Sequence, residues 1–199
     1  MALTIIILII FFFSVIVHEY CHGYVAYLNG DYTAKSMGRL TLNPIPHIDI
    51  FGTILLPLLL ILFGFRIVVG WAKPVPINPW NFRDYDKGLL QVGIAGPLSN
   101  IVLGTVFALL YRFVGSGFVG KILIYSSYLN FLLAIFNLIP IPPLDGSRII
   151  SVFLPPRIRM GYERIERYGI FIVLGILMCG FLNWIFYISQ IIANKIAGI

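Results

Sequence analysis

The apolar stretch Leu3–Leu28 reads LTIIILIIFFFSVIVHEYCHGYVAYL, and its character changes at His18. The part before that residue, Leu3–Val17, contains no charged side chain. Because a helix needs about 20 apolar residues to cross the hydrocarbon core of a bilayer, the stretch predicts a membrane-spanning helix. It has neither a positively charged start nor a small-residue cleavage site, so we interpret it as a retained span and not as a signal peptide.

The second half of this span carries the pattern H-E-x-x-H, written His18-Glu19-Tyr20-Cys21-His22. On a helix, His18 and His22 are one turn apart and share a face. Two imidazoles at this spacing can bind one zinc ion, and the intervening Glu19 can act as a general base. The pattern also occurs by chance on soluble helices. Ionisable groups inside an apolar helix are costly in lipid, however, and they indicate a functional site.

A catalytic zinc ion takes three protein ligands and keeps one position open for water. The candidates for the third ligand are His47, Asp49, Asp145 and Cys21. Asp145 is favoured, since it follows a proline-rich stretch, 138–143, and non-helical backbone at membrane depth is tolerated where it lines a cavity. The structural alternatives are a helix N-cap for Asp145, loop capping for His47 and Asp49, and a small buried filler for Cys21.

The composition of the chain indicates an integral membrane protein. Of its 199 residues, 59% are hydrophobic, and the charged residues are 14 Lys or Arg and 8 Asp or Glu. A soluble domain has about a quarter charged residues. Two cysteines are too few for a disulfide scaffold, and the high hydrophobicity excludes a disordered chain. We therefore expect a single integral membrane domain over residues 1–199. The net charge is +6, but the sequence contains no run of five basic residues, so nucleic acid is not an expected partner.

Further apolar stretches are separated by connections rich in glycine and proline. They are Ile50–Val69, Leu89–Tyr111, Ile122–Ile139 and Tyr168–Ile192. Weak alternation predicts a short strand at Gly38–Leu42. Val75–Ile77 is a second candidate strand, although prolines near it disfavour pairing. The predicted fold class is an all-α multi-span membrane protein with four to five transmembrane helices, a re-entrant segment and short β-hairpin-like loops.

Three separated motifs resemble those of the site-2 protease family of intramembrane zinc metalloproteases. They are His18-Glu19-Tyr20-Cys21-His22, Gly96-Pro97-Leu98-Ser99-Asn100, and Asn137 to Gly146 with its ending Leu144-Asp145-Gly146. The stretches Gly38–Pro44 and Gly70–Pro76 look like the small prokaryotic branch, and the resemblance runs from about residue 5 to about residue 190. The PDZ or CBS domain that the family often adds does not fit in this chain.

The resemblance implies that His18, His22 and Asp145 are the ligands of one Zn²⁺ ion. It makes Glu19 the catalytic acid and base, and it makes Asn137 a catalytic residue that holds the substrate or the oxyanion.

The same resemblance places Asn100 at the polar end of a G-x-x-x-N motif. Close helix packing through Gly96 is the alternative meaning of that motif.

The stretch 50–69 decides the topology. If it crossed the membrane, Asp145 and His22 would lie at opposite faces. A re-entrant hairpin with breaks at Pro57 and Gly64 would bring them to the same face. The hairpin also places 11 of the 14 basic residues on one side, whereas a full crossing gives 9. Since basic residues gather in cytoplasmic loops, we expect a multi-pass protein of the cell membrane with its site toward the cytoplasm.

The predicted function is hydrolysis of peptide bonds in or near transmembrane segments, with zinc-activated water and Glu19 as general base. The expected partners are a membrane-protein substrate with a transmembrane helix and the lipid bilayer. A membrane zinc transporter or sensor and a catalytically inactive scaffold that binds helices remain alternatives. Few further polar residues line the third and fifth apolar stretches, which disfavours a transport path.

Overall fold

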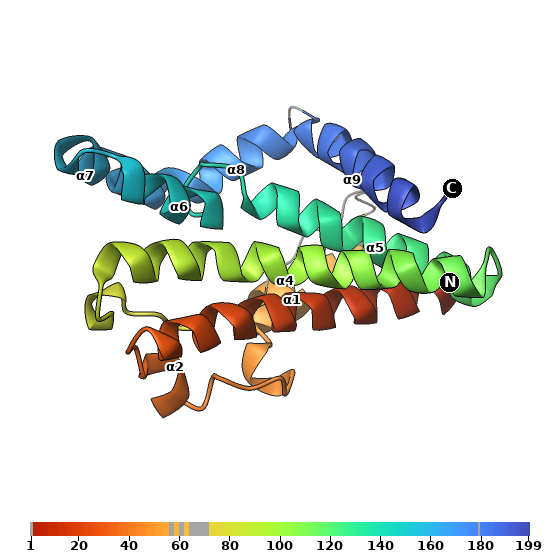
Figure 1. The fold of residues 1–199 in the computed structure, drawn as a ribbon, viewed down its shortest axis with the longest axis horizontal. Helices are drawn as coiled ribbons and strands as arrows, with labels where there is room; N and C mark the ends of the chain where they lie inside the picture. The colour runs from red at the N-terminus through yellow and green to blue at the C-terminus, as the bar shows by residue number, and fades with distance from the viewer. Residues whose placement is uncertain (1, 56–57, 60–61, 64–71, 179) are drawn as a thin grey trace.

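The computed structural model describes residues 2–55, 58–59, 62–63, 72–178 and 180–199. Every regular element in this part of the chain is helical, as predicted (Figure 1). Among these residues, three helices are long and apolar enough to cross a membrane: α1 (Ala2–Leu28), α4 (Tyr85–Val114) and α5 (Phe118–Asn137). The composition and these helices together make the chain an integral membrane protein.

Helices α1, α4 and α5 run antiparallel in sequence order and form the centre of the molecule (Figure 1). The side chain of Asp84 accepts a hydrogen bond from the Lys87 backbone nitrogen and caps the start of α4. At the other end of α4, Gly115 has a φ of 75°, which lets the chain turn back sharply into α5. As a result, the end of α1, the start of α4 and the end of α5 face the same side.

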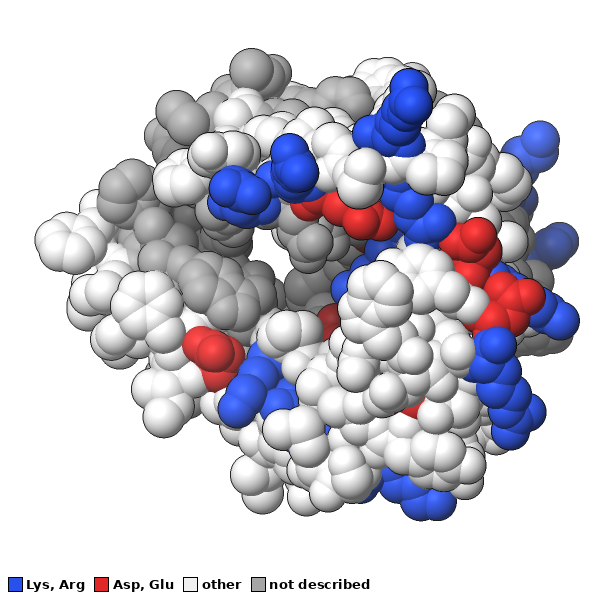
Figure 2. Space-filling view, turned by 90° about the vertical axis from the view of Figure 1, so that its left-hand side faces the viewer, with Lys and Arg blue, Asp and Glu red and all other residues white. Residues whose placement is uncertain are grey.

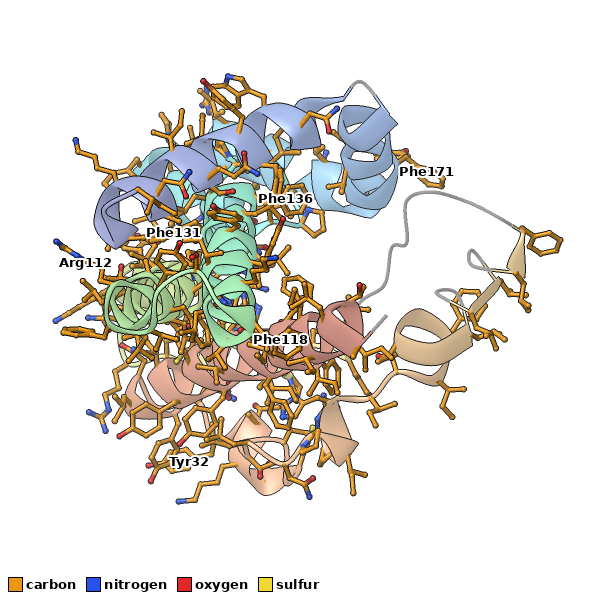
Figure 3. All side chains as sticks on the ribbon, turned by 90° about the vertical axis from the view of Figure 1, so that its right-hand side faces the viewer. Tyr32, Arg112, Phe118, Phe131, Phe136 and Phe171 are labelled. Carbon is orange, nitrogen blue, oxygen red and sulfur yellow. The ribbon has the colours of Figure 1, made fainter. Side chains whose placement is uncertain are left out.

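A small apolar core joins α4 and α5 to the C-terminal helix α9 (Phe181–Ala197). Its buried members are Ala108, Ile124, Phe131, Ala193 and Ala197. Figure 3 labels Phe131 among these helices, and its ring packs against Gly104 of α4, where a Cβ atom would lie 3.1 Å away. The short side chains let the helices approach closely, which is how helices associate where lipid supplies no hydrophobic driving force.

The last predicted span, Tyr168–Ile192, is not one helix. It contains α8 (Gly169–Met178) and α9, which are separated at Gly180 and lie at an angle to each other (Figure 1). Gly180 has a φ of 77°, a left-handed conformation that glycine adopts without steric cost. This corrects the prediction of a single span there. Before α8 come α6 (Asp145–Phe153), α7 (Pro156–Arg164) and the 3₁₀ turn η4 (Ile165–Tyr168).

The predicted count of four to five spans and the β-hairpin-like loops are not confirmed. Gly38–Leu42 forms turns and bends, and Val75–Ile77 is assigned to no strand or helix in the described part of the chain. A physical reason is visible in the second segment: the Val75 backbone nitrogen donates to the Glu19 carboxylate at 2.8 Å. The Asn78 backbone nitrogen donates likewise to the Asp31 carboxylate at 2.7 Å. Carboxylates of the α1 region thus take donors that a strand partner would need.

The connection between α1 and α4 starts and ends at the same end of the bundle. The Arg83 backbone nitrogen donates to the Asn29 carbonyl at 2.9 Å, and the Asn29 side chain donates to Gln91 at 2.9 Å. Within this connection lie α2 (Thr33–Ser36), the 3₁₀ turns η1 (Ile45–His47) and η3 (Pro79–Asn81), and the π-helical segment η2 (Ile50–Leu55). The break points predicted for a re-entrant hairpin, Pro57 and Gly64, lie outside the described residues.

Hydrogen bonds to Asp31 hold the connection between α1 and α4 against the end of α1. It is 1% exposed, and its carboxylate accepts hydrogen bonds from Thr33, from the Asn78 backbone and from the Asn81 side chain. Burial opposes ionisation of Asp31, but these donors outweigh burial and hold the pKa of the carboxyl below its usual range. The segment that reaches Glu19 through Val75 is therefore anchored a few residues further on.

Basic side chains gather at the end of the molecule that contains α2 and α7. Figure 2 faces this end and shows many Lys and Arg side chains. The sequence of α2 contains Lys35, and that of α7 contains Arg157, Arg159 and Arg164. The opposite end carries Arg112, at the end of α4, and Lys121, near the start of α5. Figure 3 faces that end and labels Arg112 pointing outward.

Candidate metal centre

Three side chains from two distant parts of the chain meet beside α4. His18 Nε2 lies 3.0 Å from His22 Nε2. Asp145 Oδ2 lies 3.1 Å from the first of these atoms and 3.0 Å from the second. The three residues are 5%, 3% and 6% exposed. Among the described residues, this is the group of His, Cys, Asp and Glu side chains whose ligand atoms converge closely enough to hold a metal ion.

The sequence explains how each member reaches this point. His18 and His22 are four residues apart on α1, so both project from one face. Asp145 is the first residue of α6, after the turns of the proline-rich segment that follows α5. Gly146 makes the close approach of this turn possible, because a Cβ atom there would lie 2.2 Å from the Leu138 carbonyl oxygen.

The outer nitrogens of both imidazoles also have partners. His22 Nδ1 lies 2.7 Å from the Val92 backbone oxygen, and His18 Nδ1 lies 2.5 Å from Asn100 Oδ1. A carbonyl oxygen only accepts, so the hydrogen of each neutral ring sits on Nδ1. Each Nε2 then carries no hydrogen, and its lone pair points toward the other ring and toward Asp145. Outer hydrogen bonds of this kind orient metal-binding histidines.

These residues fit a zinc ion. Three unprotonated acceptor atoms about 3 Å apart repel one another unless a cation lies between them. Ligands at about 2.0–2.2 Å from a tetrahedral zinc ion lie about 3.3 Å from one another, close to the observed spacing. Two imidazoles and one carboxylate are also a donor set of catalytic zinc sites, in which the fourth position is open. The arrangement therefore matches a catalytic metal centre.

Gly96 of α4 leaves room for the two imidazoles. A Cβ atom at this position would lie 2.2 Å from His22 Nε2 and 2.6 Å from His18 Nε2. The G-x-x-x-N motif thus serves both meanings considered from the sequence. Gly96 permits close contact, and Asn100, one turn later, is hydrogen-bonded to His18.

The two predicted catalytic residues, Glu19 and Asn137, have different kinds of hydrogen-bond partner in the structure. Glu19 is next to His18 on α1, and its Oε2 accepts from the Val75 backbone nitrogen at 2.8 Å. Asn137 is the last residue of α5, and its side-chain nitrogen donates to the Leu133 carbonyl of its own helix at 2.9 Å. Glu19 is therefore oriented by a neighbouring segment, whereas the Asn137 amide is turned toward its own helix.

The other candidates for the third ligand have local roles. His47 Nε2 lies 2.8 Å from the Thr41 backbone oxygen, and the Asp49 carboxylate accepts from the Gly52 backbone nitrogen at 2.7 Å. Cys21 is half-buried on α1. None of the three belongs to the convergent group. Sequence reasoning missed the roles of Val75 and Val92, which act through backbone atoms and so leave no residue-type signal.

Comparison with known proteins agrees with this site. The model of Peptidase family M50 matches residues 114–180. The protein named "Putative zinc metalloprotease YwhC" of Bacillus subtilis is 42% identical over 179 residues, which cover 84% of this chain and 78% of that protein. "Putative zinc metalloprotease Rip2" of Mycolicibacterium smegmatis is 29% identical over 184 residues, 87% of this chain and 67% of that protein. No solved structure matches the chain.

A third relative is longer than this chain. "Zinc metalloprotease MJ0392" of Methanocaldococcus jannaschii is 31% identical over 150 residues, which cover 75% of this chain and 34% of that protein. The helices, the site and these relatives define a membrane-embedded zinc metalloprotease. The chain belongs to the site-2 protease family, peptidase family M50.

Proposed function

We propose that this protease hydrolyses peptide bonds in or near transmembrane segments of other membrane proteins. The observation that carries the proposal is the position of the metal centre. His18 and His22 are buried on α1, a helix of membrane-spanning length, and Asp145 reaches them from the other side of the bundle. A substrate bond must therefore come to this membrane helix to meet the site.

In this proposal, His18, His22 and Asp145 hold one zinc ion. The ion would supply Lewis acidity and would lower the pKa of a water molecule toward about 7. The hydrogen bonds from the outer imidazole nitrogens to Asn100 and Val92 keep both rings aimed at the shared position. The protein thereby contributes ligand geometry that is set before any substrate arrives.

Glu19 is the proposed general base. It would take the proton of the attacking water and pass it to the leaving amine. Its neighbour His18 places it beside the metal centre, and the Val75 N–H holds one of its carboxylate oxygens. The hydrogen bond from Val75 therefore orients the Glu19 carboxylate on the same turn of α1 as His18.

Asn137 is the proposed donor to the substrate or to the developing oxyanion. Its side-chain nitrogen is bonded to the Leu133 carbonyl, so this role requires a rotation of the side chain. The location of Asn137 supports the proposal, because it ends α5 directly before the turns that lead to Asp145.

The membrane orientation follows from charge and topology. We propose a single domain in the cell membrane, with the metal centre toward the cytoplasm and residues 50–69 as a re-entrant segment. The support is that the connection 29–84 returns to the end where it began, and that the same end carries the dense basic surface (Figure 2). The substrate is expected to be a membrane protein whose transmembrane helix unwinds, because an intact helix shields its peptide bonds.

The test compares wild type with Glu19→Gln in proteoliposomes that contain single-span membrane proteins, with cleavage sites mapped by mass spectrometry. The wild type should cleave within or beside the span. Glu19→Gln should lose cleavage and retain its zinc. Cleavage confined to soluble peptides, or equal cleavage by both forms, would contradict the proposal. Glu163→Gln, at an exposed acidic residue of α7, is the matched control and should cleave normally.

A further inference from the structure

A chain of hydrogen bonds runs through the buried centre of the bundle and ends at His18. Asn130 of α5 donates from Nδ2 to Ser14 Oγ of α1 at 3.0 Å, and Asn100 of α4 donates from Nδ2 to Asn130 Oδ1 at 3.0 Å. Asn100 Oδ1 then faces His18 Nδ1 at 2.5 Å. Asn130 and Asn100 are 0% exposed and Ser14 is 3% exposed.

The orientation of the Asn130 amide is fixed at the far end of this chain. Its Nδ2 carries two hydrogens, and one of them goes to the Ser126 carbonyl at 2.9 Å, which only accepts. The other goes to Ser14 Oγ, which uses its own hydrogen on the Ile10 carbonyl at 3.0 Å and so must accept here. Both hydrogens of Asn130 are committed, and its Oδ1 must therefore face Asn100.

The same count of donors and acceptors determines the amide orientation of Asn100 and then the tautomer of His18. An oxygen at Asn130 requires a donor from Asn100, so Asn100 presents Nδ2 to Asn130 and Oδ1 to His18. The reverse orientation would place two oxygens against each other in a buried site, which is costly. A neutral imidazole can carry its hydrogen on either nitrogen. Opposite Asn100 Oδ1 it must be on Nδ1, which leaves Nε2 free for a metal.

We infer that Asn130 is a positioning residue for the metal centre. Through Asn100, and with support from Ser14, it fixes His18 in the tautomer that can bind zinc. His22 needs no such chain of side chains, because the Val92 backbone oxygen determines its tautomer directly. At His18 Nδ1 the acceptor is instead the side chain of Asn100, whose amide can turn over unless a partner orients it. The inference rests on the proposed zinc site and adds a residue of α5 that touches neither metal nor substrate.

The test reads the tautomer in the metal-free protein in detergent, by NMR of ¹⁵N-labelled histidine. The chain has 3 histidines, so the signals can be assigned with one variant of each. Wild type should show a hydrogen on His18 Nδ1, because Asn100 Oδ1 accepts it. Asn130→Leu keeps a similar volume and removes the polar group, and its His18 should carry that Nδ1 hydrogen in only part of the molecules. Its Kd for zinc should rise about 10–100-fold, as for other residues that orient metal ligands.

Ser127→Ala is the matched control. Ser127 is also on α5 and 0% exposed, but its hydroxyl donates to the Gly104 carbonyl and is not part of this chain. The control should keep the wild-type tautomer and zinc affinity. If Asn130→Leu fails to fold, Asn130→Ala provides the same test, since it removes the same amide from α5 with a smaller side chain.

The inference is wrong if Asn130→Leu, or Asn130→Ala in its place, matches Ser127→Ala in tautomer and zinc affinity. A role in packing alone would give that result. Failure of the proposed function would look different: wild type would bind no zinc or cleave no membrane protein, while the tautomer measured without metal would remain as stated.

Discussion

Asp145 Oδ2 lies 3.0 Å from His22 Nε2, although 123 residues separate them in the chain. Two features of the fold bring them together. Helices α1 and α5 both end on the side where α4 begins, and the turn after α5 directs the start of α6 back into the bundle. A metal site of this kind therefore depends on correct assembly of α1, α4, α5 and α6 as one unit.

Asp145→Ala should abolish stoichiometric zinc binding, as should His22→Ala, because either change leaves two of three ligands. Bound metal is measured by elemental analysis of the purified protein. Asp49→Ala is the control, since Asp49 was a sequence candidate for the same role and bonds only locally to the Gly52 backbone nitrogen. If zinc is retained in Asp145→Ala and lost in Asp49→Ala, the ligand assignment is wrong.

Gly96→Ala should weaken zinc binding although it adds a single methyl group to a helix. The new Cβ would lie 2.2 Å from His22 Nε2, so the imidazoles must move. Overpacking of this kind costs about 1–3 kcal/mol, which corresponds to about 5–150-fold in the Kd for zinc if the strain falls on the ligands. Competition with a chelator measures it.

The control for this change is Gly161→Ala on α7, where a Cβ atom has no neighbour within 4 Å. Zinc affinity should be unaltered there, and alanine should stabilise the helix slightly. Equal zinc affinities in the two variants would show that Gly96 does not limit the position of the rings.

Asp31→Asn should destabilise the protein at neutral pH by about 1–3 kcal/mol, because a buried acceptor of several hydrogen bonds is altered. The pKa of Asp31 is lowered in the folded state. The contribution of its carboxylate to stability is therefore complete above the unfolded pKa of about 3.9. It is lost as the pH falls through the lower folded value.

Thermal unfolding in detergent, measured from neutral to acidic pH, tests the direction in which the contribution of Asp31 to stability changes with pH. The difference in melting temperature between wild type and Asp31→Asn should be largest near neutral pH and should shrink below about pH 4. Asp84→Asn, at the exposed cap of α4, controls for a general effect of removing a carboxylate. A difference that grows on acidification would contradict the account of Asp31.

Cysteines introduced at Lys73 and Lys121 should react with a membrane-impermeant reagent from opposite sides of the membrane. Lys73 belongs to the segment that contacts Arg39 and Glu19, and Lys121 lies near the start of α5 at the other end. The native Cys21 and Cys179 are first replaced by serine, and zinc content verifies the background. Labelling of both positions from one side would rule out the proposed topology.

Several features were predictable because they depend on local pattern. The length and hydropathy of α1 predicted a span, and the spacing of His18 and His22 predicted a shared face. The family and the enzyme class are confirmed by the relatives. The assignment of Glu19, Asn137 and the three ligands remains a prediction that the structure makes specific.

Other features had no local signal. Gly180 is one glycine in an apolar run, and only packing of α8 and α9 gives it a left-handed conformation. Val75–Ile77 was a predicted strand, but the Glu19 carboxylate accepts from the Val75 backbone nitrogen, and the Asp31 carboxylate accepts from the next donor after the segment, the Asn78 backbone nitrogen.

The sequence by itself determined that this chain enters a membrane and carries a zinc motif, because hydropathy and helical spacing act over a few turns. Only the tertiary structure decided that the Asp145 carboxylate lies against the two imidazoles, that Gly96 leaves room for them, and that Asn130 is linked to His18 through Asn100. Those outcomes depend on contacts of about 3 Å between helices, and no rule of local spacing contains them.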